Sequence, residues 1–301
     1  MGKALCEASA RAREVYAAAD RVTGLPITEL CVSGAIEELT RTDRTQVAMF
    51  ATSLAVAAAL EEALGFAPTA LGTGGHSVGE LAAICWAGAL SLEDGLALVY
   101  QRGLLMERDS NRVDGTMVAV LGLDTERLES VCTEASKQSS AHVQVANLNA
   151  PGQVVISGAR VAVEAAATLA QAAGASRVLP LNVGGPFHSV YMSDAAVAFA
   201  SLCSHVAFSE ARFPVVLNTT AAATTEPEAL RDELSGQITR PVRWAESVQT
   251  LSRLGCTVFL ELGPGRVLGG LVRRTLPDAT VVSAGDTEAL AGAAQIWTNT
   301  R

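Results

Sequence analysis

The sequence predicts an α/β protein: a mostly parallel sheet covered by helices on both faces and interrupted by a smaller βαββαβ unit. Three stretches support this fold class. Residues 69–89 have the pattern of a strand, a glycine-rich turn and a helix, residues 112–183 follow the order β-α-β-β-α-β, and strands alternate with helices again after residue 213. Alternating strands and helices favour a parallel sheet with two covered faces, and the βαββαβ order is that of a ferredoxin-like unit.

The composition is that of a globular protein with an aliphatic core. Hydrophobic residues make up 49% of the 301 residues and aromatic residues only 4%, so alanine, valine and leucine fill the core. There is no run of about 18 apolar residues and no apolar leader at the start, so we expect a cytoplasmic protein without a membrane span. Six scattered cysteines fit reduced thiols, and a net charge of −9 argues against a nucleic-acid partner.

The first third of the chain is predicted to be mainly helical. Gly24, Pro26 and Gly34 separate the helical stretches, and Ser91 opens a Ser-Leu-Glu-Asp sequence typical of a helix start. The predicted elements are helices over 4–19, 28–32, 36–39 and 46–64, a buried strand over 68–71, and helices over 81–87 and 95–108.

The middle of the chain differs in pattern, and we predict that residues 112–183 form a small subdomain. Residues 1–111 and 184–301 then form a large subdomain. Asp124 is placed to cap the first helix of the insertion. Its predicted elements are a strand over 115–121, a helix over 124–138, strands over 142–148 and 153–157, a helix over 161–173 and a strand over 177–183.

The last third returns to the large subdomain, and its final residues are expected to be peripheral. The predicted elements are a helix over 190–202, a strand over 213–217, helices over 228–234 and 243–254, a buried strand over 258–262, a helix over 267–274, and a strand at 281–282 that closes the sheet.

The glycine-rich turn carries the pattern Gly-x-Ser-x-Gly at residues 75–79, with Ser77 at its centre. This pattern is typical of a strand-to-helix elbow, which holds a serine in a strained turn with its Oγ clear of the sheet. The following helix would place its positive dipole end and the Val78 N–H beside an oxyanion formed at Ser77. The elbow therefore predicts a nucleophilic serine.

A serine nucleophile needs a base, and the chain has only four histidines: 76, 142, 188 and 205. By elimination His188, in a Gly/Pro loop, is the best base. For His76 both a packing role beneath the turn and a site role stay open. No carboxylate is clearly placed to orient His188, although Asp194 follows it, so a dyad oriented by a carbonyl group and a full triad both stay open.

Arg102 is the one charged residue in an otherwise apolar helical stretch, residues 96–106. Such an arginine extends its charge to solvent or pairs with a nearby acid in many proteins. The functional alternative is a two-pronged contact with a substrate carboxylate, which the planar guanidinium suits and a lysine does not.

Six motifs in order carry a resemblance to a known family. The chain resembles malonyl-CoA:acyl carrier protein transacylases and the acyltransferase domains of polyketide synthases, a family with an α/β-hydrolase-like core and a ferredoxin-like insertion. The motifs are Gly-His-Ser-Val-Gly-Glu at 75–80, Gln-Arg-Gly at 101–103, Asn-Leu-Asn-Ala-Pro-Gly-Gln at 147–153, Gly-Pro-Phe-His-Ser at 185–189, Pro-Val-Val-Leu-Asn at 214–218 and Glu-Leu-Gly-Pro-Gly at 261–265.

The resemblance implies a ping-pong acyltransferase with no metal and no cofactor. Malonyl-CoA would be the donor, and the phosphopantetheine thiol of an acyl carrier protein the acceptor. Ser77 would be acylated, with His188 as general base and acid and Arg102 on the malonyl carboxylate. Val78 would give one oxyanion N–H, and the Gln237 carbonyl would orient His188. The remaining expected substrate-binding residues are His76, Met106, Asn147 and Phe187, of which Phe187 would crowd an α-methyl branch.

The sequence departs from the family pattern at two places. The family begins with a strand and Gly-Gln-Gly-Ser-Gln, whose glutamine N–H is a second oxyanion donor, and nothing here matches it. We therefore expect lower turnover than in a version extended upstream. Gln46-Val47-Ala48 replaces Gln-Pro-Ala, a change expected to alter only a helix start. A thioesterase acting on acyl carriers and a weakly active truncated relative remain alternatives, although Arg102 argues against a hydrolase of simple acyl groups.

Docking of an acidic carrier protein would need a local basic patch on this acidic chain. The candidates are Arg240, Arg243, Arg266, Arg273 and Arg274. Their alternative role is that of an ordinary solvated face.

Overall fold

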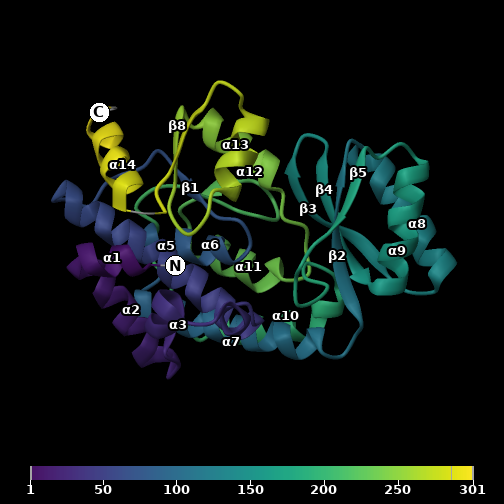
Figure 1. The fold of residues 1–301 in the computed structure, drawn as a ribbon, viewed down its shortest axis with the longest axis horizontal. Coiled ribbons are helices and arrows are strands. Elements are labelled where there is room, and N and C mark those ends of the chain that lie inside the picture. The colour runs from purple at the N-terminus through teal and green to yellow at the C-terminus, as the bar shows by residue number, and fades with distance from the viewer. Residues whose placement is uncertain (1, 286, 300–301) are drawn as a thin grey trace.

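The computed structural model describes residues 2–285 and 287–299. A mainly helical part with short strands lies beside a four-stranded sheet that is backed by two helices (Figure 1). The helices are α1 (Lys3–Ala8), α2 (Ala10–Thr23), α3 (Ile27–Ser33), α4 (Ile36–Leu39), α5 (Thr42–Leu64), α6 (Val78–Trp86), α7 (Leu92–Ser110), α8 (Thr125–Ser139), α9 (Arg160–Ala172), the 3₁₀ turn η1 (Val190–Met192), α10 (Ser193–Cys203), α11 (Pro227–Gln237), α12 (Trp244–Arg253), α13 (Val267–Thr275) and α14 (Thr287–Asn299). The strands are β1 (Thr73–Gly74), β2 (Gly115–Leu121), β3 (Val143–Ala150), β4 (Gln153–Ala159), β5 (Arg177–Pro180), β6 (Val215–Val216), β7 (Ala223–Thr224), β8 (Val258–Glu261) and β9 (Thr280–Ser283).

Capping side chains set several helix starts where the sequence predicts them. Ser91 Oγ accepts the Asp94 N–H at 3.0 Å to begin α7, and Asp124 Oδ1 accepts the Arg127 N–H at 2.8 Å to begin α8. The single helix expected over 4–19 is instead two helices. Ser9 has extended backbone between them, and its Oγ caps α2 by accepting the Ala12 N–H.

The expected strand over 68–71 is wrong, because only residues 73–74 find a partner. Strand β1 pairs in parallel with β6, Thr73 opposite Val215, whereas the Leu71 side chain is 61% exposed. Strand β6 also pairs antiparallel with β7, and β8 pairs in parallel with β9 in a separate sheet. The core is thus α/β with parallel strand pairs, as expected, and its strands lie in two short sheets within the described residues.

Two further expectations for the C-terminal part need correction. Strand β8 is half-buried along its length rather than buried. Helix α14 is not peripheral, because Leu290 and Ala293 are buried in the main hydrophobic cluster and the helix packs on α5.

Helix α5 is long and apolar enough to cross a membrane by length and composition alone. In the structure 56% of its most apolar stretch is buried, and the helix contacts α2, α6 and α7. A mostly buried core helix of a globular protein passes the same test of length and composition. We therefore assign α5 to the hydrophobic core.

The middle of the chain forms the expected βαββαβ unit, an antiparallel sheet in the order β3-β4-β2-β5. Alternate residues of its strands face opposite sides. Val120, Val145 and Ile156 pack under α8 and α9, whereas Met117 and Val155 pack on the other face together with Phe187. The outer face is thereby closed by helices and the inner face lies against the loop that holds His188. The subdomain boundaries at residues 112 and 183 stay a prediction.

Candidate active site

The elbow places Ser77 between β1 and α6 in a backbone conformation that a residue with a side chain rarely adopts. Ser77 has φ 52° and ψ −110°. A Cβ added to Gly75 would lie 2.0 Å from the Gly79 carbonyl oxygen, so the turn requires glycine there. Val78 is the first residue of α6, and its N–H therefore has no acceptor inside the helix. The elbow presents both a serine hydroxyl and a backbone donor at one point.

His188 meets Ser77 across the site, with 2.7 Å between Ser77 Oγ and His188 Nε2. On the other side of the ring, Nδ1 lies 3.2 Å from the Gln237 carbonyl oxygen and 3.1 Å from that of Arg240. Because a carbonyl oxygen only accepts, Nδ1 carries the proton and Nε2 is free to accept one from Ser77. Asp194 lies elsewhere, paired with Arg112 at 2.6 Å, so carbonyl groups rather than a carboxylate orient the histidine.

The surroundings keep His188 uncharged. Burial lowers the pKa of His188 to about 3, and the nearby Arg102 and His76 lower it in the same direction. The imidazole is therefore neutral near pH 7, which is the form that can accept a proton.

Arg102 points into the same site and does not extend to solvent, since only 1% of it is exposed. Its Nη2 donates to Ser77 Oγ at 3.1 Å and to Gln237 Oε1 at 2.8 Å, and its Nη1 donates to Gln46 Oε1. Its Nε is buried and finds no hydrogen-bond partner in the part of the chain that the structure describes. Burial lowers the pKa of Arg102 to about 10, partly offset by Glu80. A buried cation with a vacant donor beside the nucleophile is suited to an anionic group.

Gln46 is a site residue that the sequence did not reveal. The prediction placed it at a helix start, but α5 begins at Thr42 and brings Gln46 to Arg102. Its Nε2 also lies 3.4 Å from the Met106 sulfur, which places Met106 beside this group.

Gln237 contacts both Ser77 and His188 as well as Arg102. Its side-chain Nε2 donates to the Ser77 carbonyl at 3.1 Å and to Glu80, while its Oε1 accepts from Arg102. Glu80 is fully buried, and burial and the neighbouring Glu233 raise its pKa. The sequence suggested only the backbone role of Gln237.

The other expected substrate-binding residues surround this network without hydrogen bonds to Ser77. His76 Nε2 lies 2.8 Å from Asn149 Oδ1, and its ring packs on Trp244 at 5.7 Å, which favours the packing role left open for it. Asn147 is buried where β3 forms a bridge to Val242. Phe187 packs against both the main cluster and the inner face of the small sheet.

Two amide side chains form hydrogen bonds with the backbone at Ser77 and His188, and the sequence did not identify either of them as a site residue. Asn218 contacts the Ser77 and Gly75 backbone. Gln144, on β3, donates to the His188 carbonyl oxygen at 3.1 Å and accepts the Val190 N–H at 3.2 Å. Neither residue type is distinctive in sequence, because amides occur at many exposed positions.

Comparison with known proteins places the chain in a family. The model of the acyl transferase domain family matches residues 1–296. The chain belongs to this family. Among solved structures, the acyl transferase is similar to a malonyl-transacylase in complex with a type II polyketide synthase acyl-carrier protein, with 36% identity, a TM-score of 0.93, and coverage of 98% of this chain and 94% of that chain.

Curated relatives agree with this similarity. The acyl transferase is 38% identical to a malonyl CoA-acyl carrier protein transacylase of Bacillus subtilis over 96% of this chain and 90% of that protein. It is 35% identical to the protein of the same name from Escherichia coli over 94% and 90% of the two chains.

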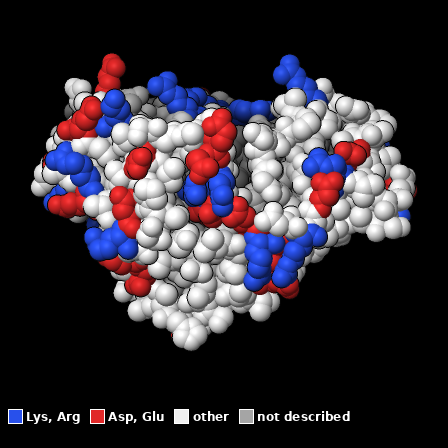
Figure 2. Space-filling view, turned by 60° about the horizontal axis from the view of Figure 1, so that its bottom comes forward, with Lys and Arg blue, Asp and Glu red and all other residues white. Residues whose placement is uncertain are grey.

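The arginines proposed for docking have neighbours of their own. Arg243 pairs with Glu246, Arg273 donates to the Val281 carbonyl, and Arg274 donates to Gln153. On the face of the acyl transferase shown in Figure 2, basic and acidic side chains lie next to each other in small groups, separated by wide uncharged areas. No group of three or more His, Cys, Asp and Glu side chains suited to a metal occurs in the part of the chain that the structure describes.

Proposed function

We propose that this acyl transferase moves a malonyl group from malonyl-CoA to the phosphopantetheine thiol of an acyl carrier protein. This activity is supported by the curated relatives named malonyl CoA-acyl carrier protein transacylase, to which the chain is similar along nearly its whole length. The observation that carries the residue roles is the position of the buried Arg102 guanidinium, 3.1 Å from a serine that is itself 2.7 Å from a neutral histidine.

In the first half-reaction Ser77 Oγ attacks the thioester carbonyl carbon of malonyl-CoA while His188 Nε2 takes the hydroxyl proton. The Val78 N–H stabilises the oxyanion, helped by the positive end of the α6 dipole. As the intermediate collapses, the carbon–sulfur bond breaks and His188 gives its proton to the leaving CoA thiolate. The product is a malonyl ester of Ser77 and free CoA.

The second half-reaction reverses these roles. His188 takes the proton of the carrier's phosphopantetheine thiol, the thiolate attacks the ester carbonyl, and the carbon–oxygen bond to Ser77 breaks. Ser77 regains its proton from His188, so that the enzyme is unchanged at the end. No metal, redox group or other cofactor takes part in this proposed sequence.

Arg102 would hold the free carboxylate of the malonyl group. Its vacant Nε–H and the Nη2–H that faces Ser77 can both donate to carboxylate oxygens, and a charge-assisted pair of this kind is strong where water is excluded. Phe187 would disfavour an α-methyl branch, a preference of about 1–3 kcal/mol for one methyl group. The cytoplasmic location expected from the six free cysteines stays a prediction.

Intact-protein mass after a brief incubation with malonyl-CoA tests the proposal. Wild-type protein should gain one malonyl group, and Ser77→Ala should gain none. Addition of phosphopantetheinylated carrier protein should then discharge the adduct onto the carrier.

The same experiment separates the alternatives. Rapid loss of the adduct in buffer without carrier would favour a thioesterase. Absence of an adduct on wild-type protein would contradict the assignment of malonyl-CoA as donor.

A further inference from the structure

The Ser77 backbone is strained and must be held by its surroundings. A positive φ at a residue with a side chain costs on the order of 1–3 kcal/mol and persists only where neighbouring groups enforce it. Such an elbow would relax if the peptide groups on either side of Ser77 could rotate. The contacts of these two peptide groups therefore decide how precisely Oγ faces His188.

The Asn218 side-chain amide makes two hydrogen bonds to the backbone on the N-terminal side of the elbow. Asn218 Oδ1 accepts the Ser77 N–H at 2.7 Å, and Asn218 Nδ2 donates to the Gly75 carbonyl oxygen, also at 2.7 Å. The residue is completely buried. A carboxamide carries a donor and an acceptor on one planar group, whereas a carboxylate only accepts and an alkyl group does neither. Asn218 thus closes a ring across the turn.

The opposite side of the elbow is held by another amide. Gln237 Nε2 donates to the Ser77 carbonyl oxygen at 3.1 Å. That carbonyl and the Val78 N–H belong to the same peptide group, so its orientation sets the direction of the oxyanion donor. Asn218 and Gln237 therefore hold the two peptides that flank Ser77.

Asn218 is itself fixed from two elements. Its N–H donates to Glu80 Oε1 of α6 at 2.8 Å, and its carbonyl oxygen accepts the N–H of Arg243, just before α12, at 2.8 Å. Glu80 thus accepts hydrogen bonds from both Asn218 and Gln237, the two residues that contact the backbone of the elbow.

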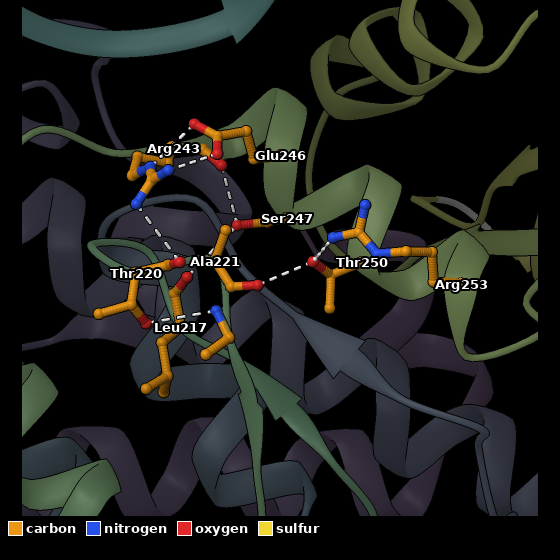
Figure 3. Close-up of polar contacts among 9 residues, drawn as sticks. Leu217, Thr220, Ala221, Arg243, Glu246, Ser247, Thr250 and Arg253 are labelled. Atoms are coloured by element: carbon orange, nitrogen blue, oxygen red, sulfur yellow. Dashed lines mark hydrogen bonds and ion pairs between the residues drawn. The ribbon is translucent and has the colours of Figure 1, made fainter.

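The loop that carries Asn218 is tied to α12 along its length (Figure 3). Thr250 Oγ1 donates to the Ala221 carbonyl oxygen at 2.8 Å, and Ser247 Oγ to that of Leu217 at 3.3 Å. The Leu217 N–H also donates to the Ala222 carbonyl, which closes the turn after β6. The loop that carries Asn218 is consequently held in place by hydrogen bonds to α12.

We infer that Asn218 is a positioning residue that clamps the nucleophile elbow and so keeps Ser77 Oγ aligned with His188. It touches no reacting atom and acts only through the Ser77 and Gly75 backbone. The inference rests on the proposed function of Ser77 and deepens it. A loss of alignment of about 1 Å can slow a reaction by about 100-fold.

The test compares the rate of malonyl loading in three variants of the full chain. Asn218→Ala, which removes the clamp, should load about 10–100 times more slowly with an unchanged KM for malonyl-CoA. Tyr16→Phe is the matched control, because it removes the buried hydrogen bond between Tyr16 of α2 and Thr52 of α5, 2.9 Å long, and touches neither the elbow nor the loop that carries Asn218. It should lose thermal stability but keep the wild-type loading rate.

Asn218→Asp gives a readout that a general loss of stability would not produce. An ionised carboxyl cannot donate to the Gly75 carbonyl, whereas a protonated one can. The buried Glu80 and Glu233, which face this position from α6 and α11, favour protonation of the introduced carboxyl. Loading by Asn218→Asp should therefore be slow at pH 8 and recover toward the wild-type rate as the pH falls to about 5.5, and Asn218→Ala should show no recovery.

A fluorophosphonate, which forms an oxygen–phosphorus bond with activated serines and releases fluoride, separates the two proposals. If wild-type protein reacts with this probe but not with malonyl-CoA, the proposed donor is wrong, and the variants are compared with the probe alone. If wild-type protein reacts with neither, the inference fails with the proposed function.

Three results overturn the inference itself while wild-type protein loads normally. These are a loading rate for Asn218→Ala within twofold of wild type, equal slowing by Asn218→Ala and Tyr16→Phe, and a wild-type rate for Asn218→Asp at pH 8. If Asn218→Ala does not fold, the pH profile of Asn218→Asp decides.

Discussion

At the scale of single residues, we propose that Arg102 selects acyl groups that carry a free carboxylate. Its guanidinium is buried, and its Nε–H has no hydrogen-bond partner among the described residues. We expect Arg102→Lys to lower malonyl loading by about 100-fold, because a single ammonium cannot reproduce the two-pronged contact. Loading from acetyl-CoA, which has no free carboxylate, should fall much less. Intact mass with each donor measures the ratio, and equal losses for both donors would contradict the carboxylate role.

If His188 is the base, as we propose, its lowered pKa should make the reaction unusually tolerant of acid. Its ordinary pKa is 6.5, and burial with the neighbouring Arg102 lowers it to about 3. Since a base acts in its unprotonated form, the rate should fall only where His188 becomes protonated, which is below its ordinary pKa. We expect kcat/KM for malonyl loading to stay nearly constant from pH 8 down to about 5. A half-maximal rate near pH 6.5, with the protein folded by circular dichroism, would show that His188 titrates as an exposed histidine does.

At the scale of elements, the small sheet contributes to the dyad through one side chain. Gln144 on β3 donates to the His188 and Thr239 carbonyl oxygens, at 3.1 and 3.3 Å, and His188 has a positive φ of 55°. We expect Gln144→Ala to slow loading about tenfold with little change in melting temperature, because His188 loses a support of its strained backbone. Gln138→Ala, on the exposed side of α8, is the control and should load like wild type.

Elements whose limits depend on local contacts could be predicted from sequence, and those that depend on distant partners could not. Helices α7 and α8 begin at the residues that directly follow their caps, Ser91 and Asp124. The β1 strand was misplaced because its two residues pair with β6, more than a hundred residues away. Ser77, His188 and Arg102 could be named from the elbow, a glycine-rich loop and an isolated charge. Asn218 follows a strand, where site residues commonly lie, but nothing local showed that it would reach Ser77.

At the scale of the whole molecule, charge poses a question for the second half-reaction. The chain has a net charge of −9, and the resemblance described above implies an acidic carrier protein as its partner. We propose that basic groups near the dyad offset the long-range repulsion between two acidic proteins. Arg240 is exposed, and its carbonyl oxygen contacts the His188 ring, so of the five arginines it is the one joined directly to the dyad.

We expect charge reversal at Arg240 to act on transfer to the carrier and not on loading. In Arg240→Glu the kcat/KM for carrier protein should fall about tenfold at low salt, while discharge to free pantetheine, a small neutral thiol, stays near wild type. Lys137→Glu changes the net charge equally on α8 and serves as the control. For wild-type protein, raising the salt from about 0.05 to 0.5 M should slow transfer to the carrier, since exposed charges are screened beyond roughly 10 Å already at 0.1 M. A salt effect of equal size on both acceptors would place its cause in the chemistry rather than in docking.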